Sequence, residues 1–194
     1  MASMATDSLR RHRLTVHDYY RMAEVGILRP DARVELIDGE IIDTAPNGSR
    51  HAGTIDQLAA IFAGLERPAR DRVMVRVQNP IRLDEHSEPK PDVALLRPRA
   101  DFYKSAHPRP ADMLLIIEVA DTSLRYDREI KVPLYARYGI PELWVVDIIG
   151  RSLTRYRDPR EGTYARIDRP DVCEPVMVDA IERLRVELGA VFLA

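Results

Sequence analysis

Two carboxylates set against apolar runs, with a lysine beyond them, are the residues of this sequence best suited to chemistry. Glu118 interrupts the apolar run Leu114–Ala120, and Asp92 stands at the entrance to a second run, Val93–Leu96, twenty-six residues upstream. A carboxylate inside an apolar strand is costly to desolvate unless it is protonated, paired or bound to a cation. Lys131 follows Glu118 by thirteen residues. Two strand-borne carboxylates and a lysine suggest a site at which Mg²⁺ or Mn²⁺ promotes phosphoester chemistry.

Each of these residues also has a purely structural explanation. Asp92 and Glu118 could end a strand, cap a turn or pair with an arginine. Lys131 lies four residues after Asp127, which is the spacing of an ordinary helical ion pair worth a few tenths of a kcal/mol. On a helical wheel, however, Lys131 lies about 100° from the apolar Ile130, a position from which it could reach over the sheet edge towards the metal site.

Three further polar residues could join the site. Glu35 lies within the apolar run Val34–Ile37 and could be a third metal ligand, or could face solvent from an edge strand. Asp147 follows the run Trp144–Val146 and could be another ligand, although a strand-end turn explains it better. His51 could contact phosphate or transfer a proton, although a capping or surface histidine is the commoner case.

Composition and missing motifs limit the classes of protein. The 194 residues suffice for one core, and 45% hydrophobic with 31% charged residues is ordinary globular usage. The single cysteine, Cys173, excludes an internal disulfide and a thiolate zinc site. A net charge of −2 gives no overall attraction to nucleic acid. No glycine-rich phosphate loop, serine-hydrolase elbow or zincin helix occurs, and no secretory or membrane-spanning segment is expected, so a cytoplasmic protein is predicted.

The elements that position these residues are predicted from periodicity and turn signals. Thr15 and Asp18 indicate a helix that ends near Gly26, and apolar steps after Ser49 indicate a second helix that ends before Pro68. A third helical segment follows Ser123 and ends near Tyr138; Pro133 within it implies that this helix either starts late or kinks. Strands are predicted at 34–42, as a hairpin turning at Asp38-Gly39 and forming the first sheet element, at 73–78 with 81–83 as its continuation, near Asp92 and Met113, at 142–147, and over 151–167.

This order predicts one α/β (α+β) domain, residues 14–194, after a flexible N-terminal segment, residues 1–13. Its mixed central sheet, flanked by helices, should contain roughly 5–8 strands. The acidic ends of two strands can then converge on one edge of a shared sheet, where open sheets favour binding sites.

Several sequence blocks, in the same order, resemble the Uma-two family of putative restriction endonucleases, within the PD-(D/E)XK nuclease superfamily. The similarity extends from about Leu14 to Phe192, and the blocks that carry it are Val34–Glu40, Gln78–Pro80, Lys90–Val93, Ile117–Ser123, Tyr126–Asp127, Lys131–Tyr135 and Gly139–Asp147.

The resemblance implies a restriction-endonuclease-like core, with Asp92 and Glu118 as metal ligands and Glu35 as an added acidic residue. The superfamily lysine would stand two residues after the glutamate, where this chain has Ala120. In this family its role is assigned to a lysine on the following helix, here Lys131. The expected activity is Mg²⁺- or Mn²⁺-dependent hydrolysis of nucleic acid, with DNA as the expected substrate. A homodimer is expected separately, because twofold dimers are the commonest assembly. The competing interpretations are a non-catalytic nucleic-acid or protein-binding module and a structural partner in a complex.

Overall fold

A computed structural model describes residues 11–65, 69–181 and 184–192 of the chain. Residues 1–10 of the predicted flexible segment lie outside the described residues, as do residues 66–68, 182–183 and 193–194 of the predicted domain. Among the described helices, none is long and apolar enough to cross a membrane.

The N-terminal elements form from local signals, as predicted. Helix α1 (Val16–Glu24) begins at Thr15, whose hydroxyl accepts from the Asp18 amide while the Asp18 carboxylate accepts from the Thr15 amide. Strands β1 (Val34–Ile37) and β2 (Glu40–Asp43) are joined through Asp38 and Gly39, both with positive φ, as a two-residue hairpin requires.

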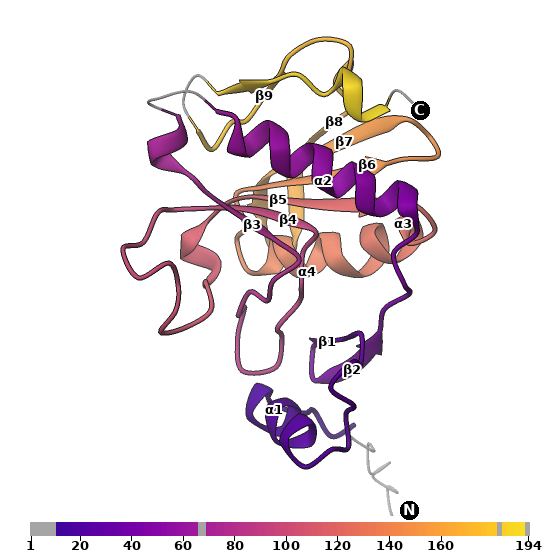
Figure 1. The fold of residues 1–194 in the computed structure, drawn as a ribbon, viewed down its shortest axis with the longest axis vertical. Coiled ribbons are helices and arrows are strands. Elements are labelled where there is room, and N and C mark those ends of the chain that lie inside the picture. Colours follow the sequence, from indigo (N-terminus) through magenta and orange to yellow (C-terminus); the bar gives the residue numbers. More distant parts are fainter. Residues whose placement is uncertain (1–10, 66–68, 182–183, 193–194) are drawn as a thin grey trace, which may run out of the picture.

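The hairpin was predicted as the first element of the main sheet, and this prediction is wrong. Strands β1 and β2 form a two-stranded sheet of their own. The hairpin is anchored by loop residues instead, because Glu88 donates its amide to the Leu36 carbonyl and Gly39 donates to the His86 carbonyl. Figure 1 shows it, together with α1, projecting from the rest of the molecule.

A six-stranded mixed sheet forms the centre, as the sequence predicted. Its strands are β3 (Met74–Val77), β4 (Val93–Leu96), β5 (Met113–Ala120), β6 (Glu142–Asp147), β7 (Ser152–Arg160) and β8 (Thr163–Asp168), in that spatial order. Only β5 and β6 run parallel. The predicted continuation of β3 at residues 81–83 is not a strand. Ile81 and Leu83 are buried in a loop whose backbone amides donate to carbonyl groups of the same loop and of Pro108. The apolar side chains there indicate burial and not a strand.

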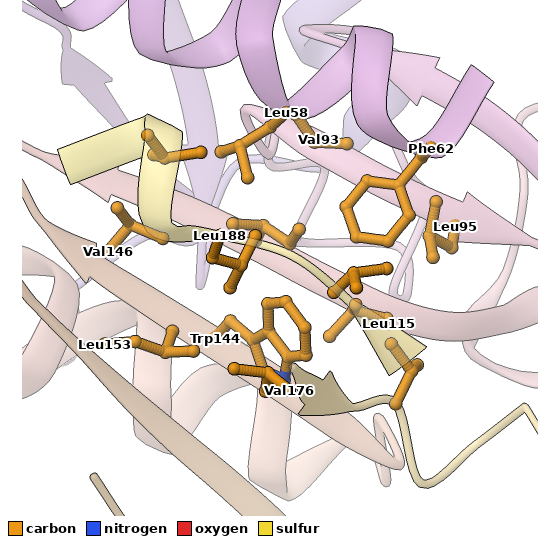
Figure 2. Packing of buried hydrophobic residues seen from close by; sticks show 14 of the residues in the cluster. Leu58, Phe62, Val93, Leu95, Leu115, Trp144, Val146, Leu153, Val176 and Leu188 are labelled. Atoms are coloured by element: carbon orange, nitrogen blue, oxygen red, sulfur yellow. The ribbon is translucent and has the colours of Figure 1, made fainter. Parts of the chain in front are cut away.

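The two faces of the sheet are covered by different segments. Helix α2 (Ser49–Ala63) and the C-terminal segment with β9 (Val176–Met177), β10 (Arg185–Val186) and the 3₁₀ turn η4 (Gly189–Phe192) pack on one face. On that face the Trp144 ring lies 6.3 Å from the Phe62 ring, among aliphatic side chains (Figure 2). Two further 3₁₀ turns, η1 (Arg70–Arg72) and η2 (Pro110–Asp112), precede β3 and β5.

The crossover between β5 and β6 covers the other face of the sheet. It consists of a helical turn α3 (Leu124–Tyr126), a π-helical turn η3 (Asp127–Lys131) and helix α4 (Val132–Arg137). The Val132 amide bonds the Asp127 carbonyl, five residues back. The hydrogen-bond register therefore shifts immediately before Pro133, which has no amide proton to donate. The helical segment is continuous from Leu124 to Arg137, so it does not start late, and a π-turn accommodates the proline.

Candidate active site

Strand β5 presents Glu118 to the face that α4 covers. Leu115, Ile117 and Val119 belong to the core cluster under α2, whereas Ile116 and Ala120 belong to the cluster under α4. Because side chains alternate along a strand, Glu118 shares the α4 side. Its side chain is only 3% exposed. A carboxylate at this depth needs partners, and α4 with η3 provides them.

Asp92 lies beside Glu118 because β4 and β5 are adjacent antiparallel strands. The register pairs Val93 with Ile117, so one further residue places Asp92 opposite Glu118. Asp92 Oδ2 accepts the Val119 amide at 2.8 Å and lies 3.4 Å from His51 Nε2 in the first turn of α2. The Gln78 side-chain amide donates to the other oxygen at 3.3 Å. The sheet thus brings together the two carboxylates that the sequence singled out.

Lys131 joins Glu118 to Glu35. Its Nζ lies 3.2 Å from Glu118 Oε1 and 3.3 Å from Glu35 Oε1, and all three side chains are buried. The Lys90 amide also donates to Glu35 Oε1, at 3.0 Å. The simple explanation of Lys131 as an ion pair with Asp127 is therefore wrong, because the π-turn and the burial of η3 direct the ammonium to Glu35 and Glu118.

Two partners of the site were missed at the sequence level. The Tyr135 hydroxyl donates to Glu118 Oε1 at 2.6 Å, and Asp127 is buried with its Oδ2 accepting from the Ser123 hydroxyl at 2.7 Å. A signal for Tyr135 was present: it follows Lys131 by four residues and so lies on the same helical face. For Asp127 the sequence indicated a helical ion pair with Lys131 and a place in the block Tyr126–Asp127, but not its burial.

The electrostatics follow from burial and crowding of like charges. Burial raises the pKa of Glu118 to about 8, and the neighbouring carboxylates add to the shift. Burial alone would lower the pKa of Lys131, but Glu118, Glu35, Asp127 and Asp92 together raise it well above its usual value. Lys131 is therefore a permanent cation, surrounded by more carboxylates than one positive charge can neutralise.

Asp92 and His51 form a second coupled pair. Burial acts to raise the pKa of Asp92, but the hydrogen bond to His51 and the charge of Lys131 bring it below its ordinary value. The same hydrogen bond raises the pKa of His51. The Nδ1 atom of His51 is buried without a hydrogen-bond partner. Asp92 is thus held ionised, and His51 keeps one ring nitrogen free.

These groups form the floor of a pocket of about 520 Å³. One wall is the hairpin with the segments on either side of it, residues 32–35 and 42–48; the other is the start of the crossover, residues 121–123, 126 and 127. Figure 1 shows the segment after β2 running up to the first turn of α2, beside α3. Asp147 does not line this pocket. Its Oδ1 accepts the Gly150 amide at 2.7 Å, so Asp147 stabilises the turn at the end of β6, as the structural explanation of this residue predicted.

The chemistry of the donor set fits a hard divalent cation. Glu35 Oε2 is buried without a hydrogen-bond partner, and Glu35, Asp92, Glu118 and Asp127 outnumber the single ammonium of Lys131. In the part of the chain that the structure describes, no three His, Cys, Asp or Glu side chains are arranged to hold a metal ion by themselves. Mg²⁺ typically binds one or two carboxylates and completes its shell with water and substrate phosphate. Asp92 and Glu118 suit that role.

Comparison with known proteins supplies an independent line of evidence. A family model described as "Uma2: Putative restriction endonuclease" matches residues 16–186. The crystal structure of a putative nuclease belonging to DUF820 from Anabaena variabilis ATCC 29413 superposes with a TM-score of 0.67 at 13% identity, covering 92% of this chain and 97% of that one. At this identity the superposition demonstrates a shared fold. No curated protein matches the chain.

Proposed function

This chain belongs to the Uma2 family of putative restriction endonucleases, and on that premise we propose that it is a nuclease that hydrolyses phosphodiester bonds with the help of Mg²⁺ or Mn²⁺. The family is the one that the sequence blocks predicted. We further propose DNA as the substrate, because the family description names restriction endonucleases. The homodimer and the cytoplasmic location remain predictions.

One observation carries the proposal: four carboxylates, those of Glu35, Asp92, Glu118 and Asp127, lie around the buried ammonium of Lys131 and outnumber it. Lys131 satisfies one oxygen each of Glu35 and Glu118, and Glu35 Oε2 has no partner. Burying uncompensated negative charge is costly, so this floor is suited to a further cation. Such a cation would neutralise the excess negative charge and would also attract the phosphate of a nucleic acid.

The residues have separable roles in this proposal. Asp92 and Glu118 would hold the cation, with Glu35 beside them. A bound Mg²⁺ or Mn²⁺ would supply Lewis acidity towards a phosphate oxygen and would lower the pKa of water. Lys131 places a fixed positive charge at the floor, where negative charge grows on the phosphate during attack.

Tyr135 and His51 orient the carboxylates. The Tyr135 hydroxyl, on α4, donates to Glu118 Oε1 and so orients this carboxylate. The other carboxylate oxygen, Oε2, does not share this donor. His51 holds Asp92 through Nε2, which keeps that carboxylate in place.

The test is cleavage of single- and double-stranded DNA and RNA by pure protein, with Mg²⁺, Mn²⁺ or a chelator. We expect metal-dependent cutting that is lost in Asp92→Ala and in Glu118→Ala. Asp147→Asn is the matched control, because this aspartate ends the neighbouring strand outside the pocket and asparagine preserves its turn. Cutting retained by folded Asp92→Ala or Glu118→Ala would refute the assigned roles.

A non-catalytic module is the competing outcome. Such a protein would bind nucleic acid or another protein without cutting under any metal condition. Titration with Mg²⁺ or Mn²⁺ separates the two, because a catalytic site should bind the cation with an affinity that falls in Asp92→Ala.

A further inference from the structure

Polar atoms without partners are concentrated in the pocket. Among the described residues, four buried side-chain nitrogen or oxygen atoms have no hydrogen-bond partner, and three of them line the pocket: Glu35 Oε2, His51 Nδ1 and Tyr126 Oη. The first two belong to side chains that accompany the cation or orient its ligand in the proposed function. Resting on that function, we propose that the Tyr126 hydroxyl is a substrate contact, which donates a hydrogen bond to an oxygen of the phosphodiester in the pocket.

The missing partner of the Tyr126 hydroxyl is informative because buried polar atoms are rarely left unpaired. Burial removes their hydrogen bonds to water, and folded proteins normally replace them. The fourth unpaired atom, Arg157 Nε, lies outside the pocket, and its guanidinium is still paired with Asp168 and Asp179 through the other two nitrogens. Tyr126 has no such compensation, because Oη is its only polar side-chain atom. The pattern indicates that a bound molecule supplies the partner.

The Tyr126 side chain has its hydroxyl at the inner end. Tyr126 is the last residue of α3, in the crossover wall of the pocket. The residue as a whole is half-buried, whereas Oη is buried, so the oxygen lies deeper than the ring. Of the surrounding carboxylates, Glu35 on the opposite wall acts most strongly on the pKa of Tyr126. The hydroxyl therefore lies towards the acidic floor, where a phosphate would meet the cation.

Hydrogen-bond donors for a phosphate are scarce at this floor. The Ser123 hydroxyl already donates to Asp127, and the Tyr135 hydroxyl already donates to Glu118. Ionised carboxylates can only accept, and their charge repels a phosphate. The Tyr126 hydroxyl is buried in the same pocket and keeps its donor unused.

The Tyr126 hydroxyl also keeps its proton at neutral pH. Burial raises the pKa of Tyr126 to about 12, and the charge of Glu35 adds to the shift. A protonated hydroxyl donates one hydrogen bond, and a bond to a charged acceptor is stronger than one between neutral groups. Directed at a phosphate oxygen, this donor would stabilise the negative charge that grows there during attack.

The variant Tyr126→Phe removes the hydroxyl alone and gives three separate readouts. In cleavage of duplex DNA with Mg²⁺, kcat/KM should fall roughly 10- to 100-fold, as expected for the loss of one hydrogen bond to a charged group. In calorimetry, inorganic phosphate added to the Mg²⁺-saturated protein should bind at least roughly tenfold more weakly. Thermal stability without ligands should not fall, because the hydroxyl has no partner in the protein to lose.

Two other tyrosines provide matched controls. Tyr138→Phe removes a hydroxyl that donates to Asp84 outside the pocket, so it should lower the stability and leave phosphate binding unchanged. Tyr135→Phe removes the donor to Glu118, so it should weaken the binding of Mg²⁺. Tyr126→Phe should leave the Mg²⁺ affinity unchanged, because its hydroxyl is assigned to the phosphate.

Phosphate binding separates this inference from the proposed function, because it needs no cleavage. The inference would be overturned by an unchanged phosphate affinity in Tyr126→Phe, by a wild-type protein that binds no phosphate, or by a loss of stability as large as that of Tyr138→Phe. A weaker Mg²⁺ affinity in Tyr126→Phe would also overturn it, since the hydroxyl would then serve the cation. Weaker phosphate binding by the variant of a protein that cuts no nucleic acid would support the contact and refute the hydrolysis.

Discussion

Replacing Lys131 by methionine tests whether the buried ion-pair cluster is understood. Methionine retains an unbranched stem of similar length but removes the charge that lies 3.2 Å from Glu118 and 3.3 Å from Glu35. Breaking a buried pair by removing one partner typically costs about 3–5 kcal/mol, because the remaining charge is left uncompensated. The expected loss is larger near pH 9 than near pH 6, because burial raises the pKa of Glu118 to about 8 and its charge needs the lysine once the carboxylate is ionised.

Urea unfolding followed by circular dichroism measures this loss. With a slope of about 2 kcal/mol per molar urea, the transition midpoint should fall by roughly 1.5–2.5 M. Lys104→Met is the control: Lys104 is exposed, and its substitution should change stability by less than about 0.5 kcal/mol.

A double-mutant cycle with Glu118→Gln isolates the pair. Removing both charges leaves less unpaired charge than removing the lysine alone, so the double variant should be more stable than the two single losses predict, by about 1–3 kcal/mol. A loss below about 1 kcal/mol in Lys131→Met, or strictly additive losses in the double variant, would refute the account of the cluster given above.

Three further predictions concern other contacts. Tyr135→Phe removes the hydroxyl that donates to Glu118 at 2.6 Å, so thermal unfolding should show a loss of about 1.5–3 kcal/mol and calorimetry a weaker Mg²⁺ affinity; an unchanged affinity would contradict the positioning role. Thr15→Ala removes the cap of α1 and should cost about 1 kcal/mol in urea unfolding, with an undiminished stability arguing against the capping box. Burial raises the pKa of Glu142 above its usual 4.5, so the folded state binds its proton more tightly than the unfolded state does. Stability should therefore fall as pH rises from about 4.5 through the folded pKa, and this local decline should be absent from Glu142→Gln in urea titrations at several pH values; an identical pH profile in the two proteins would contradict it.

Local elements followed from the sequence because their signals are local. The capping pair Thr15 and Asp18, the turn residues Asp38-Gly39 and the apolar steps of α2 each act through residues a few positions apart. The sequence likewise singled out Asp92 and Glu118, since a carboxylate at an apolar strand conflicts with its surroundings wherever the strand is placed. The sequence blocks that resemble the Uma2 family predicted the fold class, because they include the strand residues of the central sheet.

Long-range decisions needed the tertiary structure. Periodicity could not tell that the hairpin would pair outside the main sheet, or that residues 81–83 are buried as a loop, because burial gives loops and strands the same apolar character. The partner of Lys131 was a choice between Asp127, four residues away, and Glu35, ninety-six residues away. A π-turn before Pro133 and the burial of η3 made that choice, and neither is encoded in spacing alone. The sequence determined which residues are chemically unusual, whereas the three-dimensional packing determined which of them meet, because desolvation and charge pairing depend on neighbours that only the fold brings together.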